Sequence, residues 1–81
     1  MPYIKDEDRD RVLTTQLPTT SGELNYLITT FCLDYLLETD QKYRDYNEII
    51  GVLECVKQEF YRRAVVPYEE KKKEENGDVF E

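Results

Sequence analysis

The 81-residue sequence contains no histidine and no tryptophan, and only two cysteines. Histidine is the usual side chain for proton transfer near neutral pH and a common zinc ligand, so its absence disfavours most enzyme classes. Structural zinc normally needs four nitrogen or sulfur ligands, which two isolated cysteines do not supply. We therefore expect a non-enzymatic protein with no catalytic residue, no metal site and no cofactor.

Long apolar runs are also missing. No stretch approaches the roughly 18 to 20 apolar residues that cross a bilayer, and the start MPYIKDEDRDR is more acidic than a signal or transit peptide. With 36% charged residues and a net charge of -7, we expect one soluble cytoplasmic domain over residues 1–81 that binds no membrane. The negative charge also disfavours binding to duplex nucleic acid.

The apolar spacing predicts an all-α fold built on a helical hairpin. The first arm covers about residues 20–38, where Thr20 and Glu23 have the spacing of a capping box. Its apolar positions recur every three or four residues and are expected to form core. They are Leu24, Leu27, Ile28, Phe31, Cys32, Tyr35 and Leu36.

The second arm is predicted over about residues 45–65, with Asp45 as its capping residue and Glu48 completing a second capping box. Its main stripe comprises Ile49, Val52, Leu53, Val56 and Phe60. The polar segment 38–42 is short enough for the two arms to fold back antiparallel and bury each other's stripes. Gly51 suggests close approach by another backbone, with a tolerated helical glycine as the alternative.

Shorter elements are expected at both ends of the hairpin. Residues 1–5 form an extended arm, and a helix from about Asp6 to Gln16 covers the edge of the core with Val12 and Leu13 before Pro18 stops it. The second arm should run to about Ala64, where residues 65–67 bend or end it. Pro67 can start a short solvated helix that ends in a tail over residues 76–81.

Self-association is predicted because so small a core rarely supplies enough stability alone. The chain has more apolar residues than its short helices readily cover, which favours a homo-oligomer. The interface candidates are Tyr3, Ile4, Val65, Val66, Val79 and Phe80.

Tyrosines beside arginines mark the candidate ligand site. Tyrosine offers a flat apolar face and arginine pairs with phosphate, so a small anionic molecule could bind there. The first candidates are Tyr61, Arg62 and Arg63, followed by Tyr43 and Arg44. In the alternative interpretation, Tyr61 fills the helix margin and the arginines pair with Glu59 or with acids of another subunit.

The remaining reactive groups are interpreted as structural. Cys32 and Cys55 lie on or beside the apolar stripes, so we expect reduced, packed and inert thiols. Asp34 and Glu54 lie away from those stripes, as solvated charges do. A magnesium-dependent hydrolase would need such carboxylates to converge in one pocket.

The segments MPYIK, GELNYLIT, GVLECVKQEFYRR, PYEEKK and ENGDVF occur in order along nearly the whole chain. Together they resemble a family of small uncharacterised proteins from bacteria, archaea and their phages. The resemblance carries over no catalytic residue. It implies a phage or mobile-element accessory factor, with an anti-defence role in the host cytoplasm.

These observations lead to three functional hypotheses. The first is a non-enzymatic homo-oligomer that sequesters a small anionic, nucleotide-like ligand. The alternative is a protein–protein interaction module or inhibitor that binds a host protein through its acidic surface and apolar ends. The third is a metal-dependent nucleotide hydrolase.

Overall fold

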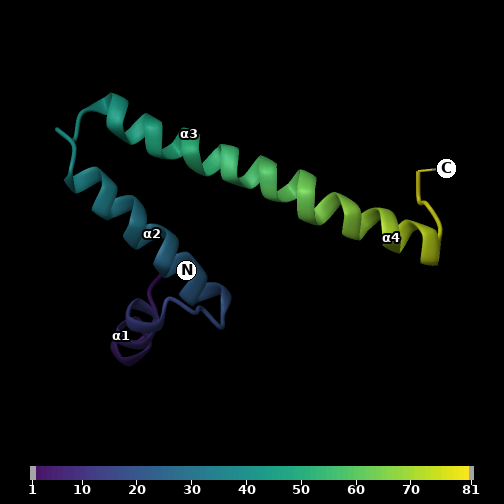
Figure 1. Cartoon of the computed structure of the whole chain (residues 1–81), viewed down its shortest axis with the longest axis horizontal. Coiled ribbons are helices and arrows are strands. Elements are labelled where there is room, and N and C mark those ends of the chain that lie inside the picture. Colours follow the sequence, from purple (N-terminus) through teal and green to yellow (C-terminus); the bar gives the residue numbers. More distant parts are fainter. Residues whose placement is uncertain (1, 81) are drawn as a thin grey trace. The chain divides into compact units, whose positions relative to one another are not determined.

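The computed structural model describes residues 2–80, which contain helices and no strand. The elements are α1 (Asp6–Thr15), α2 (Ser21–Leu37), α3 (Tyr43–Phe60), the π-helix η1 (Tyr61–Val65) and α4 (Val66–Asn76), shown in Figure 1. The all-α prediction is confirmed. No helix among the described residues is long and apolar enough to cross a membrane.

The chain forms two compact units, residues 1–46 and 47–81, which we call unit 1 and unit 2 and describe separately. Because the arms of the expected hairpin fall largely in different units, their antiparallel pairing stays a prediction, as does the single domain over residues 1–81.

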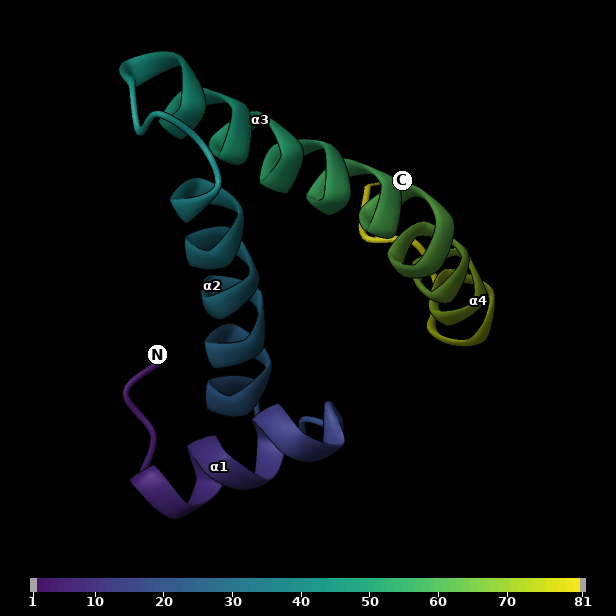
Figure 2. The same ribbon diagram turned by 60° about the vertical axis from the view of Figure 1, so that its left-hand side comes forward.

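In unit 1, α1 packs across the beginning of α2 (Figure 2). Three acidic residues occupy the first turn of α1, at the positive end of its dipole. The helix ends at Thr15, since Gln16 adopts the left-handed conformation (φ 55°) and its N–H donates to the Val12 carbonyl at 2.7 Å. The predicted end at Gln16 was therefore one residue too late, and the stop precedes Pro18.

The core of unit 1 is smaller than the sequence pattern indicates. Val12 is fully buried and Leu27 nearly so, which makes α1 the source of the most buried side chain. The prediction that α1 covers only the edge of the core was wrong. Within unit 1 the rest of the α2 stripe is not buried, because α1 is ten residues long and covers only part of α2, and packing of this stripe on the second arm stays a prediction. The exposed members are Leu24, Ile28, Phe31 and Tyr35.

The first turn of α2 has the predicted cap. The Glu23 N–H donates to Thr20 Oγ1 at 3.1 Å, so Thr20 stands just before the helix. The first turn of α3 differs from its prediction. The helix begins at Tyr43, and the buried Asp45 reaches back to accept the Lys42 N–H at 3.0 Å. Asp45 thus caps from within the first turn and does not begin the helix.

No residue of unit 2 is buried over positions 47–80. In the α3 stripe Ile49 and Leu53 are half-buried, while Val56 and Phe60 are 58% and 65% exposed. Within unit 2 these two side chains are not buried, and their burial against the first arm stays a prediction together with the hairpin. Around Gly51 no described atom of unit 2 lies within 4 Å of a Cβ built there.

The helical path continues past Ala64, where the sequence predicted a bend or an end (Figure 1). Instead of stopping, the chain widens into η1, in which the Val66 N–H donates to the Tyr61 carbonyl five residues earlier. Pro67 explains the change, since it has no N–H and its ring crowds the carbonyl four residues before it. The predicted helix at Pro67 exists as α4, although it includes Asn76 from the predicted tail.

Candidate functional site

The most tightly connected polar group lies where α1 meets α2. Glu23 is buried, and its Oε2 accepts from the Arg11 guanidinium at 2.5 Å. Its other oxygen, Oε1, accepts from the Thr19 N–H at 2.9 Å and from the Thr19 hydroxyl at 3.0 Å. Both carboxylate oxygens are therefore occupied, by groups from α1 and from the turn before α2.

This geometry shifts the ionisation of both charged partners. The hydrogen bond from Arg11 holds the pKa of the Glu23 carboxyl below its ordinary value, with a further contribution from Thr19. The same hydrogen bond raises the pKa of Arg11. A carboxylate stabilised in its charged form is a poor general base near neutral pH. The Arg11–Glu23 pair therefore fastens α1 to α2 and does not form a catalytic site.

Arg9 connects the N-terminal arm to both helices. Its Nε donates to the Ile4 carbonyl at 2.9 Å, and its guanidinium lies 5.6 Å from the centre of the Tyr26 ring. Ile4 is half-buried, whereas Tyr3 beside it is exposed. The arm is thus held through its backbone, and Tyr3 contributes little to the core of unit 1.

The structure places Tyr61, Arg62 and Arg63 together in η1. Both arginines pair with Glu59, Arg62 through a hydrogen bond and Arg63 at 3.8 Å. Their side chains are 70% and 74% exposed. The pairing with Glu59 considered from the sequence is present, and one carboxylate faces two guanidinium groups, which leaves one positive charge in excess.

The second pair of ligand candidates lies in unit 1. Tyr43 is exposed, and Arg44 Nε lies 3.9 Å from the carboxylate of Asp45. Asp45 already accepts a backbone hydrogen bond, so Arg44 adds only a loose ion pair at the surface. Tyr43 and Arg44 thus offer an open aromatic face and a cation, without an enclosing cavity.

The predicted interface residues differ widely in burial. Val79 and Phe80 are 89% and 94% exposed, so neither side chain packs on unit 2. Ile4 and Val65 are half-buried, and Val66 is 38% exposed. The strongly exposed candidates are therefore Tyr3, Val79 and Phe80.

The thiols and carboxylates form no metal site among residues 2–80, where no group of three possible ligands converges. Cys32 is half-buried and Cys55 is exposed, so the prediction of a packed thiol was wrong for Cys55. Glu54 accepts a hydrogen bond from Gln58 at 3.1 Å and pairs with Lys57 at 3.4 Å. These contacts, Gln58 first, lower the pKa of Glu54.

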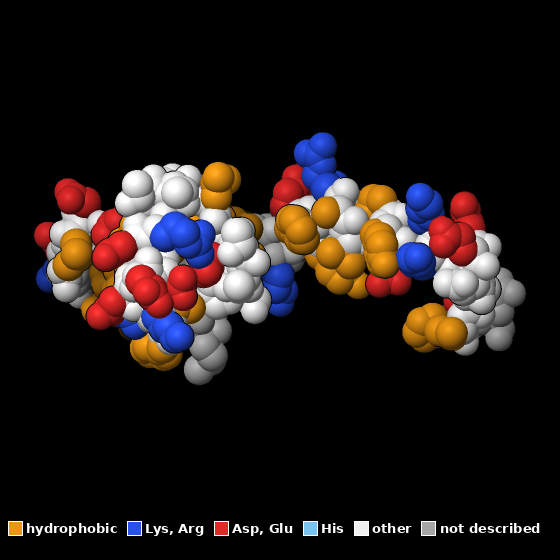
Figure 3. Space-filling view, turned by 90° about the horizontal axis from the view of Figure 1, so that it is seen from below, with side chains coloured by type: hydrophobic (Ala, Val, Ile, Leu, Met, Phe, Trp, Pro, Cys, Tyr) orange, Lys and Arg blue, Asp and Glu red, His pale blue; other side chains and the backbone are white. Residues whose placement is uncertain are grey.

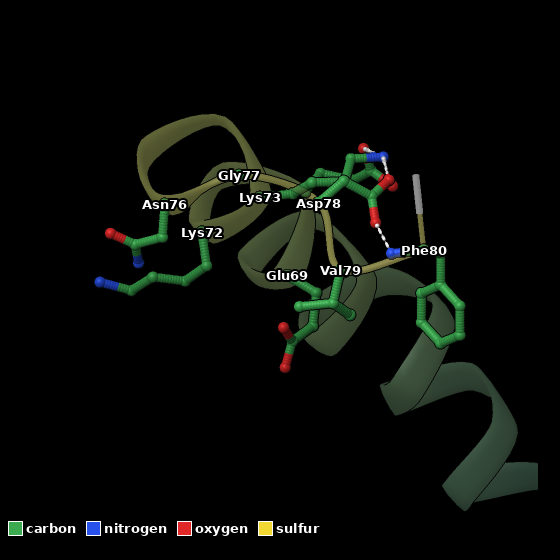
Figure 4. A pocket seen from close by; sticks show the side chains of 9 residues that line it. Glu69, Lys72, Lys73, Asn76, Gly77, Asp78, Val79 and Phe80 are labelled. Carbon is green, nitrogen blue, oxygen red and sulfur yellow. Dashed lines mark hydrogen bonds and ion pairs between the residues drawn. The ribbon is translucent and has the colours of Figure 1, made fainter.

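An open groove of about 440 Å³ lies between the end of α4 and residues 77–80 (Figure 4). Lys73 on its wall pairs with Glu70 at 3.1 Å and with Asp78 at 3.9 Å, and Glu70 is the main cause of its raised pKa. Lys72 pairs with Glu75 at 3.4 Å. Because both lysines have acidic neighbours, the groove is not a preformed anion site.

Comparison with known families gives one match. A family model described as "Domain of unknown function (DUF6899)" matches residues 1–79. The chain belongs to this family. No curated protein and no solved structure matches the DUF6899 chain.

Sequence reasoning missed the Arg11–Glu23 pair and the contact of Arg9 with Tyr26. Part of the signal was present, since Thr20 and Glu23 have capping-box spacing and two arginines follow the acidic start of α1. The missing information was the crossing of α1 over α2, which brings Arg11 to a carboxylate that the capping box had been expected to use locally.

Proposed function

We propose that this DUF6899 domain is a non-enzymatic binding protein that works as a homo-oligomer. The observation that carries the proposal is the apolar stripe of α3, which we define as Ile49, Leu53, Val56 and Phe60. Within unit 2 its last two members are exposed and its first two are half-buried. Figure 3 shows hydrophobic side chains gathered along the middle of the helical stretch that runs from α3 to α4, with charged side chains around them. An apolar face of this kind is typical of a protein-binding surface.

The polar groups support the non-enzymatic part of the proposal. Over residues 2–80 the acidic and basic side chains near the candidate sites pair with one another, as Glu59 does with Arg62 and Arg63. The best-positioned carboxylate, Glu23, is occupied by Arg11 and Thr19. Such groups stabilise helices and leave no paired acid and base directed at a substrate.

Sedimentation velocity of the full chain from 1 to 100 µM tests self-association. We expect a species of at least twice the 9.7 kDa chain mass, with a fraction that rises with concentration. Phe60→Glu should shift the population toward monomer, because it places a charge on the apolar stripe. Leu17→Glu is the control for a charge at an exposed apolar residue outside that stripe and outside the predicted interface. A 9.7 kDa species alone at 100 µM would contradict the proposal.

A specific observation favours anion binding as a second function. Arg62 and Arg63 both lie in η1, and π-helical turns occur frequently at functional sites. The excess positive charge over Glu59 would attract a small phosphate-bearing molecule, with Tyr61 as a stacking surface. A host protein as the bound partner, and an anti-defence role, follow from the family resemblance and stand as hypotheses beside it.

Calorimetry with a panel of nucleotides tests this second function. We expect one class to bind the wild-type chain and to lose at least about tenfold in affinity when Arg62 and Arg63 are both replaced by alanine. Arg44→Ala, which removes the other candidate cation, is the control that ranks the two tyrosine–arginine sites. Unchanged binding in the Arg62/Arg63 variant, or no binding by any nucleotide, would exclude η1 as the site.

A further inference from the structure

The α3 stripe has the spacing of a two-helix seam. Its residues follow one another at intervals of four, three and four, which is the a/d pattern of a coiled coil. Ile50 and Val52, both exposed, widen the apolar face on the two sides of this stripe. The regular spacing of the stripe itself fits a second helix.

The order of these intervals reads the same in both directions. A two-fold axis between positions 54 and 55 therefore places the stripe of one copy on the stripe of another, antiparallel. Leu53 then lies opposite Val56 of the second copy, and Ile49 lies opposite its Phe60. Each layer joins a larger side chain to a smaller one, so the seam can fill without two large groups colliding.

The edge of the stripe adds complementary charge. Glu54 and Lys57 pair within one chain at 3.4 Å. In the antiparallel register Lys57 lies opposite Ile50 of the second copy, whose Glu54 is one helical turn further along the same edge. The Lys57 stem can cover that Ile50 while its ammonium group reaches that Glu54, and the two-fold axis repeats the contact.

A parallel pair would lack this contact. In a parallel register the edge that carries Lys57 meets the opposite edge of the second copy, where Val52 and Glu59 lie, and Glu59 already pairs with Arg62 and Arg63 of its own chain. We infer that the α3 stripe binds the α3 stripe of a second copy of this chain in an antiparallel pair. The inference rests on the proposed homo-oligomer and names its interface.

Cysteine cross-linking tests the register in the full chain. Both native cysteines are first replaced by serine, and Leu53→Cys and Val56→Cys are made separately in that background. On mixing and mild oxidation we expect the disulfide between the two different variants to exceed either homodimeric disulfide, because only the antiparallel register brings position 53 opposite position 56. Predominant homodimeric disulfides would indicate a parallel pair and overturn the inference.

Charge exchange provides a second test. The design uses two single variants, Glu54→Lys and Lys57→Glu, each of which places like charges along the edge.

 Either variant alone should dimerise more weakly, by roughly fivefold in Kd, because two exposed charge contacts are lost from the pair. An equal mixture should form the mixed dimer preferentially, since one copy then presents lysines and the other glutamates.

Glu70→Lys is the matched control, because Glu70 and Lys73 form an equivalent ion pair three residues apart on α4, outside the stripe. It should leave dimerisation unchanged. Absence of mixed-dimer preference overturns the antiparallel register. If sedimentation still shows an oligomer, the proposed function stands and only this interface is wrong, whereas a chain that stays monomeric at 100 µM contradicts both.

Discussion

In unit 1 two helices bury side chains against each other, whereas in unit 2 the described residues form a long helical segment with no buried side chain. Val12, Leu27 and the Arg11–Glu23 pair give unit 1 a core and a fixed crossing. Unit 2 has capping, ion pairs along the helix and exposed apolar groups. Isolated helices are only marginally stable in water, so we expect unit 2 to lose its order more easily than unit 1.

The largest expected effect comes from breaking the core of unit 1. Val12→Asp puts a carboxylate at a fully buried position, which should cost several kcal/mol of folding free energy. Amide hydrogen exchange should become fast across α1 and the beginning of α2, while exchange in α4 stays unchanged. Leu13→Asp is the control, because Leu13 is exposed on the same helix. Equal effects of the two variants would show that α1 does not supply this core.

Acid should also weaken unit 1 selectively. The folded pKa of Glu23 lies below its ordinary value of 4.5, so its stabilising contribution is complete above that pH and is lost as the pH falls through the folded pKa. Glu23→Gln should be less stable than wild type at pH 7 and should lose less stability on acidification. Urea unfolding followed by circular dichroism between pH 7 and pH 2 measures both effects.

Glu7→Gln is the control for this pH dependence, because Glu7 is an exposed acid on α1. It should keep the wild-type dependence below pH 4.5. If Glu23→Gln shows the same acid dependence as wild type, the buried pair with Arg11 does not link the helices in solution.

In unit 2 the corresponding test is the π-helical turn. Pro67→Ala restores an N–H and removes the ring that crowds the Arg63 carbonyl, so the segment from α3 to α4 should become regular α-helix. We expect a local stabilisation of about 1–3 kcal/mol, seen as slower amide exchange over residues 61–70. Pro18→Ala, outside any helix, should not change that exchange. Unchanged exchange in Pro67→Ala would show that proline does not cause η1.

Local interactions could be predicted from the sequence, and interactions between helices could not. The spacing of Thr20 and Glu23 correctly predicts the beginning of α2, because a cap depends on residues three positions apart. The partner that fixes the Glu23 carboxylate is Arg11, on another helix. No local pattern specifies that contact, since it depends on how α1 crosses α2.

The apolar stripes show the same limit. Spacing identified which side chains of α3 share a face, including Val56 and Phe60, but it did not tell what covers that face. At Tyr61–Arg63 the sequence predicted a ligand site, with arginines paired to Glu59 as the alternative, and Glu59 does pair with both arginines. The π-helical turn itself was missed, because proline was expected to bend or end the helix and the chain instead accommodates it with a wider turn.

The smallest expected effect compares one ion pair in each unit. Arg62→Gln removes an exposed guanidinium beside Glu59, which Arg63 also contacts, so the free energy of unfolding should change by no more than about 0.5 kcal/mol. Arg11→Gln should lower stability clearly more, because it leaves the buried Glu23 carboxylate without its cation. Urea unfolding of both variants at pH 7 measures the difference. A large loss in Arg62→Gln would mean that Arg62 contacts a second copy or a bound anion, since water screens the pair seen within one chain.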